Sequence, residues 1–295
     1  MRTGSMLLAA MLAAAADGPG LLVSTGWLAE NLGQDDLVVL HVGARKDYDE
    51  GHIPGARLIE LSDISATSED GLRLELPPAE RLREAFSRLG ISDSSRIVVY
   101  AGTPTFQSAT RVFFTLDYLG LAERTALLDG GLGAWRAEGR ALTTETALAR
   151  RGNFTPRPLP DRVADAGWIN RHNGRDGVLL LDARTPEFYT GASPGAMPRA
   201  GHIPGARNIP YPTLVDADGR FKNREQLAAM FEAAGARSDA TVVTYCHIGH
   251  QATALYFAAR YLGYTARLYD GSFQDWSRRP ELPVELVSSG ARDAN

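Results

Sequence analysis

One seven-residue sequence, Gly-His-Ile-Pro-Gly-Ala-Arg, occurs twice in this 295-residue chain, at 51–57 and 201–207. Two weaker pairs follow in the same order, 97–101 with 242–246 and 128–135 with 269–276. The offset between the copies drifts slowly, from 150 residues at the first pair to 145 and 141 at the later two. A preserved order with a slowly drifting, domain-sized offset indicates two copies of one domain rather than a solenoid of short repeats.

Each copy alternates strand-like and helix-like segments. Continuous apolar or β-branched runs, typical of buried parallel strands, lie at 37–42, 96–101, 125–128, 178–181, 241–245 and 266–269. Apolar residues at helical spacing lie at 80–89, 107–119, 224–234, 251–262 and 273–276. This alternation predicts an α/β fold with two tandem domains, each a parallel sheet covered by helices on both faces.

Proline and glycine indicate where the domains begin and end. Residues 143–160, with three prolines and no apolar periodicity, are predicted to form an extended surface linker. The linker separates a first domain at 21–142 from a second at 161–287.

Residues 1–16 join an early arginine to an apolar run that ends in alanines. This pattern fits a short secretory signal peptide, an alanine-rich helix, or a later start of translation. A signal peptide would place the protein in the periplasm or outside the cell, and its absence would leave the protein in the cytoplasm.

Composition narrows the function classes. The formal net charge of −4 gives no attraction for polyanions, so nucleic acid is not expected as a partner. No apolar run reaches the ~18 residues of a membrane span, so no membrane partner is expected. The single cysteine, Cys246, excludes an intrachain disulfide and a cysteine-rich zinc site.

Cys246 stands at the end of a predicted strand, where ligands of open parallel sheets bind. The loop 246–251 follows, and a helix is predicted directly after it. Gly249 permits a left-handed backbone that curls successive N–H groups around an anion, and the helix N-terminus also favours negative charge. Both features favour a thiolate and make Cys246 a candidate nucleophile; the alternative is a buried, inert cysteine.

Residues 48–59 and 266–276 resemble the N-terminal and C-terminal signatures of the two-domain rhodanese sulfurtransferases, with Asp275 where glutamate is commoner. The resemblance runs from about Leu21 to Leu286. It implies two tandem rhodanese-like domains and a catalytic cysteine opening a six-residue loop in the second, a position that Cys246 matches. It also implies a degenerate first domain, in which Ala101 stands where the cysteine would be.

The resemblance implies that sulfane sulfur passes from thiosulfate or 3-mercaptopyruvate to cyanide or a thiol through a Cys246 persulfide, with no cofactor and no metal. Arg184 is expected to hold the loop or an anionic donor while Asp182 orients it, or else to form a structural ion pair. The expected substrate-binding residues of the loop are His247, Ile248, Gly249, His250 and Gln251.

The loop departs from the family's two substrate patterns. Thiosulfate-preferring relatives commonly carry lysine where this chain has Ile248, and 3-mercaptopyruvate-preferring relatives usually have Cys-Gly-Ser-Gly where this loop begins Cys-His-Ile-Gly. His247 and His250 are expected to supply hydrogen-bond donors to the substrate, or positive charge if they are protonated. The family's further substrate-binding arginine would fall on Phe188, so that role is not transferred.

A non-catalytic sulfur carrier is the main alternative, and a sulfur-donating or sulfur-accepting protein would then be a partner. A cysteine phosphatase is disfavoured, because its loop needs an arginine where Ala252 stands. A metal site is disfavoured, because Cys246, His247 and His250 have no fourth ligand nearby in the sequence.

Four aromatic residues of the repeat motifs are expected to be structural. The two histidines lie in tight turns, and each tryptophan is expected to pack a helix against its sheet. These residues are His52, His202, Trp135 and Trp276.

Overall fold

The computed structural model describes residues 20–287, so segment 1–16, a candidate signal peptide, lies outside the described residues. Two five-stranded parallel sheets have the same strand order, which confirms the repeat. The first contains β1 (Leu22–Val23), β5 (Thr125–Leu128), β4 (Arg96–Ala101), β2 (Leu37–Val42) and β3 (Arg57–Ile59), in spatial order. The second contains β6 (Val163–Ala164), β10 (Thr265–Tyr269), β9 (Thr241–Tyr245), β7 (Val178–Asp182) and β8 (Arg207–Asn208).

Helices cover both faces of each sheet, as predicted. In the first domain, one face packs against α1 (Thr25–Asn31) and α5 (Gly131–Ala137), and the other against α3 (Ala79–Arg88) and α4 (Gln107–Tyr118). In the second, the corresponding pairs are α6 (Ala166–His172) with α10 (Ser272–Trp276), and α8 (Arg224–Ala233) with α9 (Ala252–Leu262). The remaining helices are α2 (Arg45–Glu50) and α7 (Pro186–Thr190), with 3-10 turns at Leu61–Asp63, Ala122–Arg124, Pro160–Arg162 and Tyr211–Leu214.

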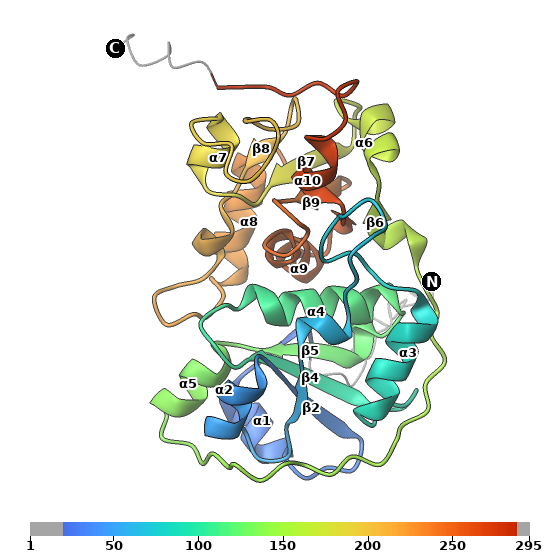
Figure 1. The fold of residues 1–295 in the computed structure, drawn as a ribbon. Helices are drawn as coiled ribbons and strands as arrows, with labels where there is room; N and C mark the ends of the chain where they lie inside the picture. The colour runs from blue at the N-terminus through green and yellow to red at the C-terminus, as the bar shows by residue number, and fades with distance from the viewer. Residues whose placement is uncertain (1–19, 288–295) are drawn as a thin grey trace, which may run out of the picture.

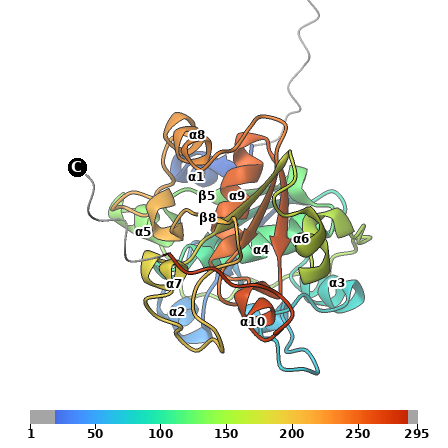
Figure 2. The same cartoon turned by 90° about the horizontal axis from the view of Figure 1, so that it is seen from above.

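The two domains pack through α4 and α9, which lie side by side between the sheets (Figures 1 and 2). The ring centroids of Phe113 and Phe257 are 4.9 Å apart in an edge-to-face arrangement. The hydroxyls of Thr110 and Thr253 lie 2.7 Å apart and are hydrogen-bonded. One cluster of buried apolar side chains includes residues of both domains, so a single hydrophobic core continues from one sheet to the other.

The repeated heptad fixes the same contact in both domains. The amide of Ile203 donates to the phenol oxygen of Tyr245, and the amide of Ile53 donates to that of Tyr100, each at 3.1 Å. Both heptad histidines are buried and hydrogen-bonded to backbone carbonyl groups, as expected for structural residues. Since Tyr245 directly precedes Cys246, the heptad holds the strand end from which the candidate site begins.

Both motif tryptophans pack between a helix and its sheet, as expected. Trp135 and Trp276 are almost fully buried, on the sheet faces that α1 with α5 and α6 with α10 cover. Residues 143–160 run irregularly along the first domain toward the second (Figure 1). One side chain of this segment, Phe154, is 1% exposed and packs near Phe86. Backbone hydrogen bonds also hold the segment, such as those from Gly152 to Ser87 and from Arg157 to Leu119. One buried ring and backbone contacts produce no periodic pattern in the sequence. None of the helices within residues 20–287 is long and apolar enough to cross a membrane.

Candidate active site

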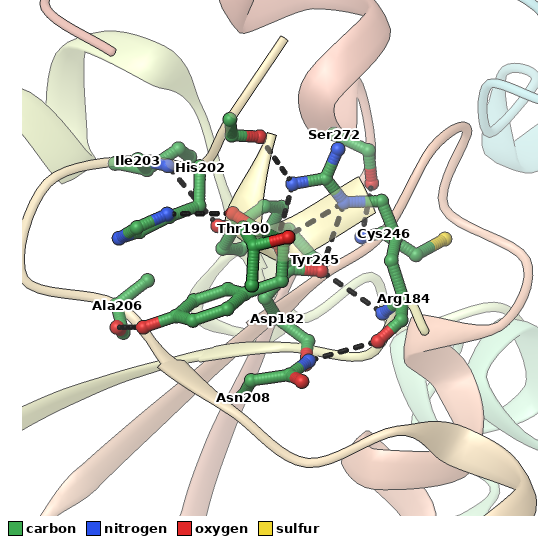
Figure 3. Close-up of polar contacts among 12 residues, drawn as sticks. Asp182, Arg184, Thr190, His202, Ile203, Ala206, Asn208, Tyr245, Cys246 and Ser272 are labelled. Atoms are coloured by element: carbon green, nitrogen blue, oxygen red, sulfur yellow. Dashed lines mark hydrogen bonds and ion pairs between the residues drawn. The ribbon is translucent and has the colours of Figure 1, made fainter. Parts of the chain in front are cut away.

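Cys246 directly follows β9, a central strand of the second sheet, and its side chain is buried. Its amide donates to the hydroxyl of Ser272 at 3.2 Å, and its carbonyl accepts from the amide of Phe273 at 2.9 Å. In Figure 3 the sulfur points away from the pair formed by Asp182 and Arg184. The first turn of α10 therefore holds the backbone of Cys246, and the sulfur is directed away from the ion pair.

The loop after the cysteine holds a run of unused hydrogen-bond donors. None of the five backbone N–H groups of residues 247–251 donates a hydrogen bond within residues 20–287. Gly249 has a left-handed backbone (φ +74°), and a Cβ there would lie 2.6 Å from the carbonyl oxygen of Asp270, so only glycine fits. Consecutive unpaired N–H groups beside a thiol form a concave site suited to negative charge.

Arg184 and Asp182 form a buried ion pair. Arg184 Nε lies 3.0 Å from both carboxylate oxygens, and its Nη2 lies 2.5 Å from Oδ2 and 2.8 Å from the carbonyl oxygen of Gly201. The guanidinium carbon lies 4.1 Å from the ring centroid of Phe273. These contacts are those of the structural ion pair considered from the sequence, and contact with a donor stays a prediction.

Asp182 keeps Arg184 charged although the guanidinium is buried. Burial opposes the charge, but the carboxylate of Asp182 raises the pKa of Arg184 above its ordinary value.

Of the two roles expected for the loop histidines, the lowered pKa values favour neutral hydrogen bonding over positive charge. Burial is the main cause that lowers the pKa of each to about 4, and the nearby charge of Arg184 for His247, or Arg111 for His250, lowers it further. The ring of His247 meets that of Phe188 edge-on at 4.5 Å, and Nε2 of His250 lies 3.2 Å from the hydroxyl of Ser108. Near neutral pH both rings are therefore neutral hydrogen-bonding groups.

The other two predicted loop residues lie close to the cysteine in the chain and are half-buried. Ile248 places an aliphatic side chain in the loop, and the Oε1 of Gln251 is buried with no hydrogen-bond partner within residues 20–287. A substrate contact by either residue stays a prediction.

Arg111 of α4 is a site residue that sequence reasoning missed. It is fully buried, and its Nη1 donates to the carbonyl oxygen of Gly249 at 3.0 Å and to Oδ1 of Asp270 at 2.6 Å. Its Nη2 donates to the carbonyl oxygen of Leu74 at 2.6 Å. The first domain thus holds the loop of the second across 138 positions of sequence. The only sequence signal was an arginine inside an otherwise apolar helix face.

Residues 71–76 of the first domain also close over the second domain (Figure 1). The amide of Leu76 donates to Oδ2 of Asp270 at 2.7 Å, and the amide of Arg73 donates to Gln274 at 3.0 Å. Glu75 lies between these contacts, where burial and then the charge of Asp270 raise its pKa to about 8. No sequence pattern connects this acidic residue with the loop.

The equivalent loop of the first domain offers fewer donors. Ala101 ends β4, the amide of Gly102 donates to Val42, and the amide of Phe106 donates to Pro104. Pro104 has no N–H group. In the loop 102–106, only the amides of residues 103 and 105 donate no hydrogen bond within the described part of the chain. Neither the nucleophile nor the full run of donors is therefore present in this copy. Within residues 20–287, no group of three or more His, Cys, Asp or Glu side chains is placed to hold a metal ion.

Known proteins match this chain over nearly its whole length. The family model described as a rhodanese-like domain matches residues 24–138 and again 165–279. A probable 3-mercaptopyruvate sulfurtransferase of Pseudomonas aeruginosa is 36% identical over 277 residues, covering 89% of this chain and 97% of that protein. A thiosulfate sulfurtransferase of Azotobacter vinelandii is 31% identical over 269 residues, covering 90% and 97%.

A third relative, the sulfur carrier protein TtuD of Thermus thermophilus, is 34% identical over 291 residues, covering 90% of this chain and 96% of that protein. Among solved structures, the anaerobic ergothioneine biosynthesis enzyme of Chlorobium limicola superposes with a TM-score of 0.81. That likeness covers 91% of this chain and 70% of the other at 22% identity, and it supports the fold alone.

Proposed function

Since this chain belongs to the rhodanese family and is a two-domain sulfurtransferase, we propose that it carries sulfane sulfur from an anionic donor to cyanide or a thiol as a persulfide on Cys246. The observation that carries the proposal is the position of the one cysteine. It is buried at the end of a central strand, beside five consecutive N–H groups with no partner within residues 20–287.

In the first half-reaction the Cys246 thiolate attacks the outer sulfur of thiosulfate. A new S–S bond forms to the enzyme, the S–S bond of the donor breaks, and its electron pair leaves with sulfite. The negative charge then resides on the outer sulfur of the persulfide. The unpaired N–H groups of the loop stabilise that charge without rearrangement, because Gly249 and Arg111 already fix the loop.

In the second half-reaction the acceptor attacks the outer sulfur of the persulfide. With cyanide, a C–S bond forms, the enzyme S–S bond breaks, and thiocyanate leaves while Cys246 returns to the thiolate. A thiol acceptor takes the same sulfur and leaves as its own persulfide. Because every step is a nucleophilic displacement at sulfur, the cycle consumes no external oxidant or reductant.

The donor is proposed to be thiosulfate or 3-mercaptopyruvate, the two substrates in the names of the relatives. The test is to incubate the protein separately with each donor and to determine its intact mass. We expect a gain of one sulfur atom in the unmodified protein and none in Cys246→Ser. Transfer by a folded Cys246→Ser protein above a few percent of the original rate would overturn the assignment of the nucleophile.

A sulfur-carrier role is the second candidate, and the resemblance to a named sulfur carrier protein favours it. The same cysteine would accept sulfur from a partner protein rather than from a small donor. Slow turnover with both small donors, together with rapid persulfide transfer from a protein donor such as a cysteine desulfurase, would select the carrier role. Rapid turnover with either small donor would select the enzyme.

A further inference from the structure

A well-formed cavity lies in the first domain, at the position equivalent to that of Cys246. It encloses about 830 Å³. Its walls are the loop at 101–107, the stretch 130–138 that includes α5, and residues 211–221 of the second domain. Figure 1 shows the chain between β8 and α8, which contains 211–221, running down beside α5. A cavity of this size matches the small-molecule sites of proteins and is far larger than a thiosulfate ion needs.

A segment of the opposite domain closes the cavity, as residues 71–76 close over the loop of the second domain. Oδ1 of Asp129 accepts from the amide of Phe221 at 2.9 Å, just as Oδ2 of Asp270 accepts from the amide of Leu76. The cavity therefore keeps the enclosure of an active site but has Ala101 in place of the nucleophile. Such a site is suited to binding and not to sulfur transfer.

Aromatic side chains from both domains form part of the cavity wall. The ring centroid of Phe106 lies 5.9 Å from that of Tyr211 and 5.6 Å from that of Phe221. The pair Phe106–Phe221 is edge-to-face and the pair Phe106–Tyr211 is tilted, and together these rings give an apolar surface on which a further flat ring can pack.

The same wall offers one polar side chain with no partner. Gln107 is only 8% exposed, and its backbone carbonyl is used by the hydroxyls of Thr110 and Thr253. Its side-chain amide forms no hydrogen bond within the described part of the chain, although the residue lines the cavity. Neither amide atom is fully enclosed by protein, so the amide can pair with a donor and an acceptor of a ligand in the cavity.

Carboxylates outnumber cations in the lining of the cavity. Arg220 Nη2 donates to Glu138 at 2.9 Å, and Arg136 donates to the carbonyl oxygen of Gly51 at 3.3 Å. The exposed Asp216 and Asp218 stand at the rim. With three carboxylates against two guanidinium groups, the lining gives an anion no net attraction, so the site favours an uncharged molecule.

We propose that this cavity is a second, non-catalytic binding site, which takes an uncharged ligand with an aromatic ring and an amide-like hydrogen-bonding edge. The ring packs on Phe106, Tyr211 and Phe221, and the polar edge pairs with the amide of Gln107. The ligand class differs from that of the Cys246 site, whose unpaired N–H groups favour anionic sulfur donors.

The test uses 4-fluorobenzamide as the probe and the nearly isosteric anion 4-fluorobenzoate as its control, both followed by fluorine NMR with the full-length protein. We expect saturable binding of the amide and binding of the benzoate that is weaker by about tenfold or more. Thiosulfate should not displace the amide, and Cys246→Ser should bind it equally well. Binding that thiosulfate abolishes would assign the probe to the Cys246 site and overturn the proposal.

Two variants locate the probe. A Cβ on Gly133 would meet no atom within 4 Å, so Gly133→Phe can fill the cavity, with Gly133→Ala as the matched small control. Gln107→Met keeps the length of the side chain and removes its hydrogen bonds. We expect Gly133→Phe to abolish binding, Gly133→Ala to retain it, and Gln107→Met to weaken it about fivefold or more.

Unchanged binding in a folded Gly133→Phe protein overturns the proposed site. If that variant does not fold, Gln107→Met decides, and full binding by it overturns the proposal. Absence of saturable binding to the unmodified protein does so as well. None of these results depends on sulfur transfer, so failure of this site and failure of the proposed reaction are distinguishable.

Discussion

Ile248 occupies the loop position at which a cation would help an anionic donor. We expect Ile248→Lys to raise kcat/KM for thiosulfate, because a hydrogen bond to a charged group contributes about 1–3 kcal/mol. That energy corresponds to roughly one to two powers of ten in rate. Steady-state kinetics with thiosulfate measure the gain, and Ile248→Met is the uncharged control. An equal rate for the lysine and methionine variants would show that this position does not select the donor.

The lowered pKa values of His247 and His250 predict a pH profile that does not depend on them. Because both pKa values are about 4, neither ring gains charge between pH 5 and 8. A fall of activity on the acid side should therefore persist in a His247→Gln, His250→Gln variant. A profile of kcat/KM against pH checks this, and an acid limb that disappears in the variant would contradict it.

The same two pKa values carry a consequence for stability. Between pH 6.5 and 4 the unfolded chain binds protons at His247 and His250 that the folded protein does not. Stability should therefore decrease as pH falls through this window, and less steeply in the double glutamine variant. Denaturant unfolding at several pH values measures the two slopes.

Cys246 and its loop could be proposed as the site from the sequence, because a lone cysteine, a glycine and a strand end are local features. The sequence left open whether the loop histidines are charged, since burial depends on side chains distant in the chain. Arg111 and Glu75 could not be identified, because their roles depend on contacts that only the packing of two domains creates.

At the scale of loops, the two copies differ in how many backbone donors are unused. Five N–H groups are unpaired at 247–251 and two at 102–106, within the described residues. We therefore expect a Cys246→Ser, Ala101→Cys variant to have little activity, although it carries one cysteine at an equivalent strand end. Thiosulfate turnover and the intact mass test this. Efficient turnover would show that the run of N–H groups is not needed.

The contact between α4 and the loop 246–251 gives a prediction for Arg111, a helix residue of the other domain. Arg111→Gln removes the donor to Gly249 and should lower kcat about 10- to 100-fold, because small displacements of reacting groups are costly. Breaking the buried pair with Asp270 should also destabilise the protein, by about 3–5 kcal/mol.

The control for Arg111→Gln is Arg162→Gln, which removes an ion pair to Asp117 on the same helix without touching the loop. Rates are compared per folded molecule, at a temperature where both variants are folded. If Arg162→Gln lowered kcat as much as Arg111→Gln, the contact with Gly249 would have no particular role.

Long buried elements were predictable and short edge elements were not. The central strands at 37–42, 96–101, 125–128 and 241–245 occur with the predicted bounds, because continuous apolar runs mark strands buried on both faces. Edge strands of two or three residues, such as β1 and β8, are too short to carry a pattern. The prediction for α9 began at 251, whereas the helix begins at Ala252.

At the scale of the whole molecule, the shared core predicts one cooperative unit. Side chains of both domains belong to a single buried cluster centred on α4 and α9. We expect calorimetry to show one unfolding transition, with equal calorimetric and van't Hoff enthalpies. Two separated transitions would show that the domains unfold independently.

Each half of the molecule closes the other half's loop, through residues 71–76 over one and 211–221 over the other. A gene that arose by duplication could therefore replace its first cysteine by alanine at little cost, because the second copy retained the nucleophile. It could not discard the first copy as well, since the surviving loop would lose its lid and the arginine that holds it. Reciprocal enclosure thus preserves a domain that has no reaction of its own to perform.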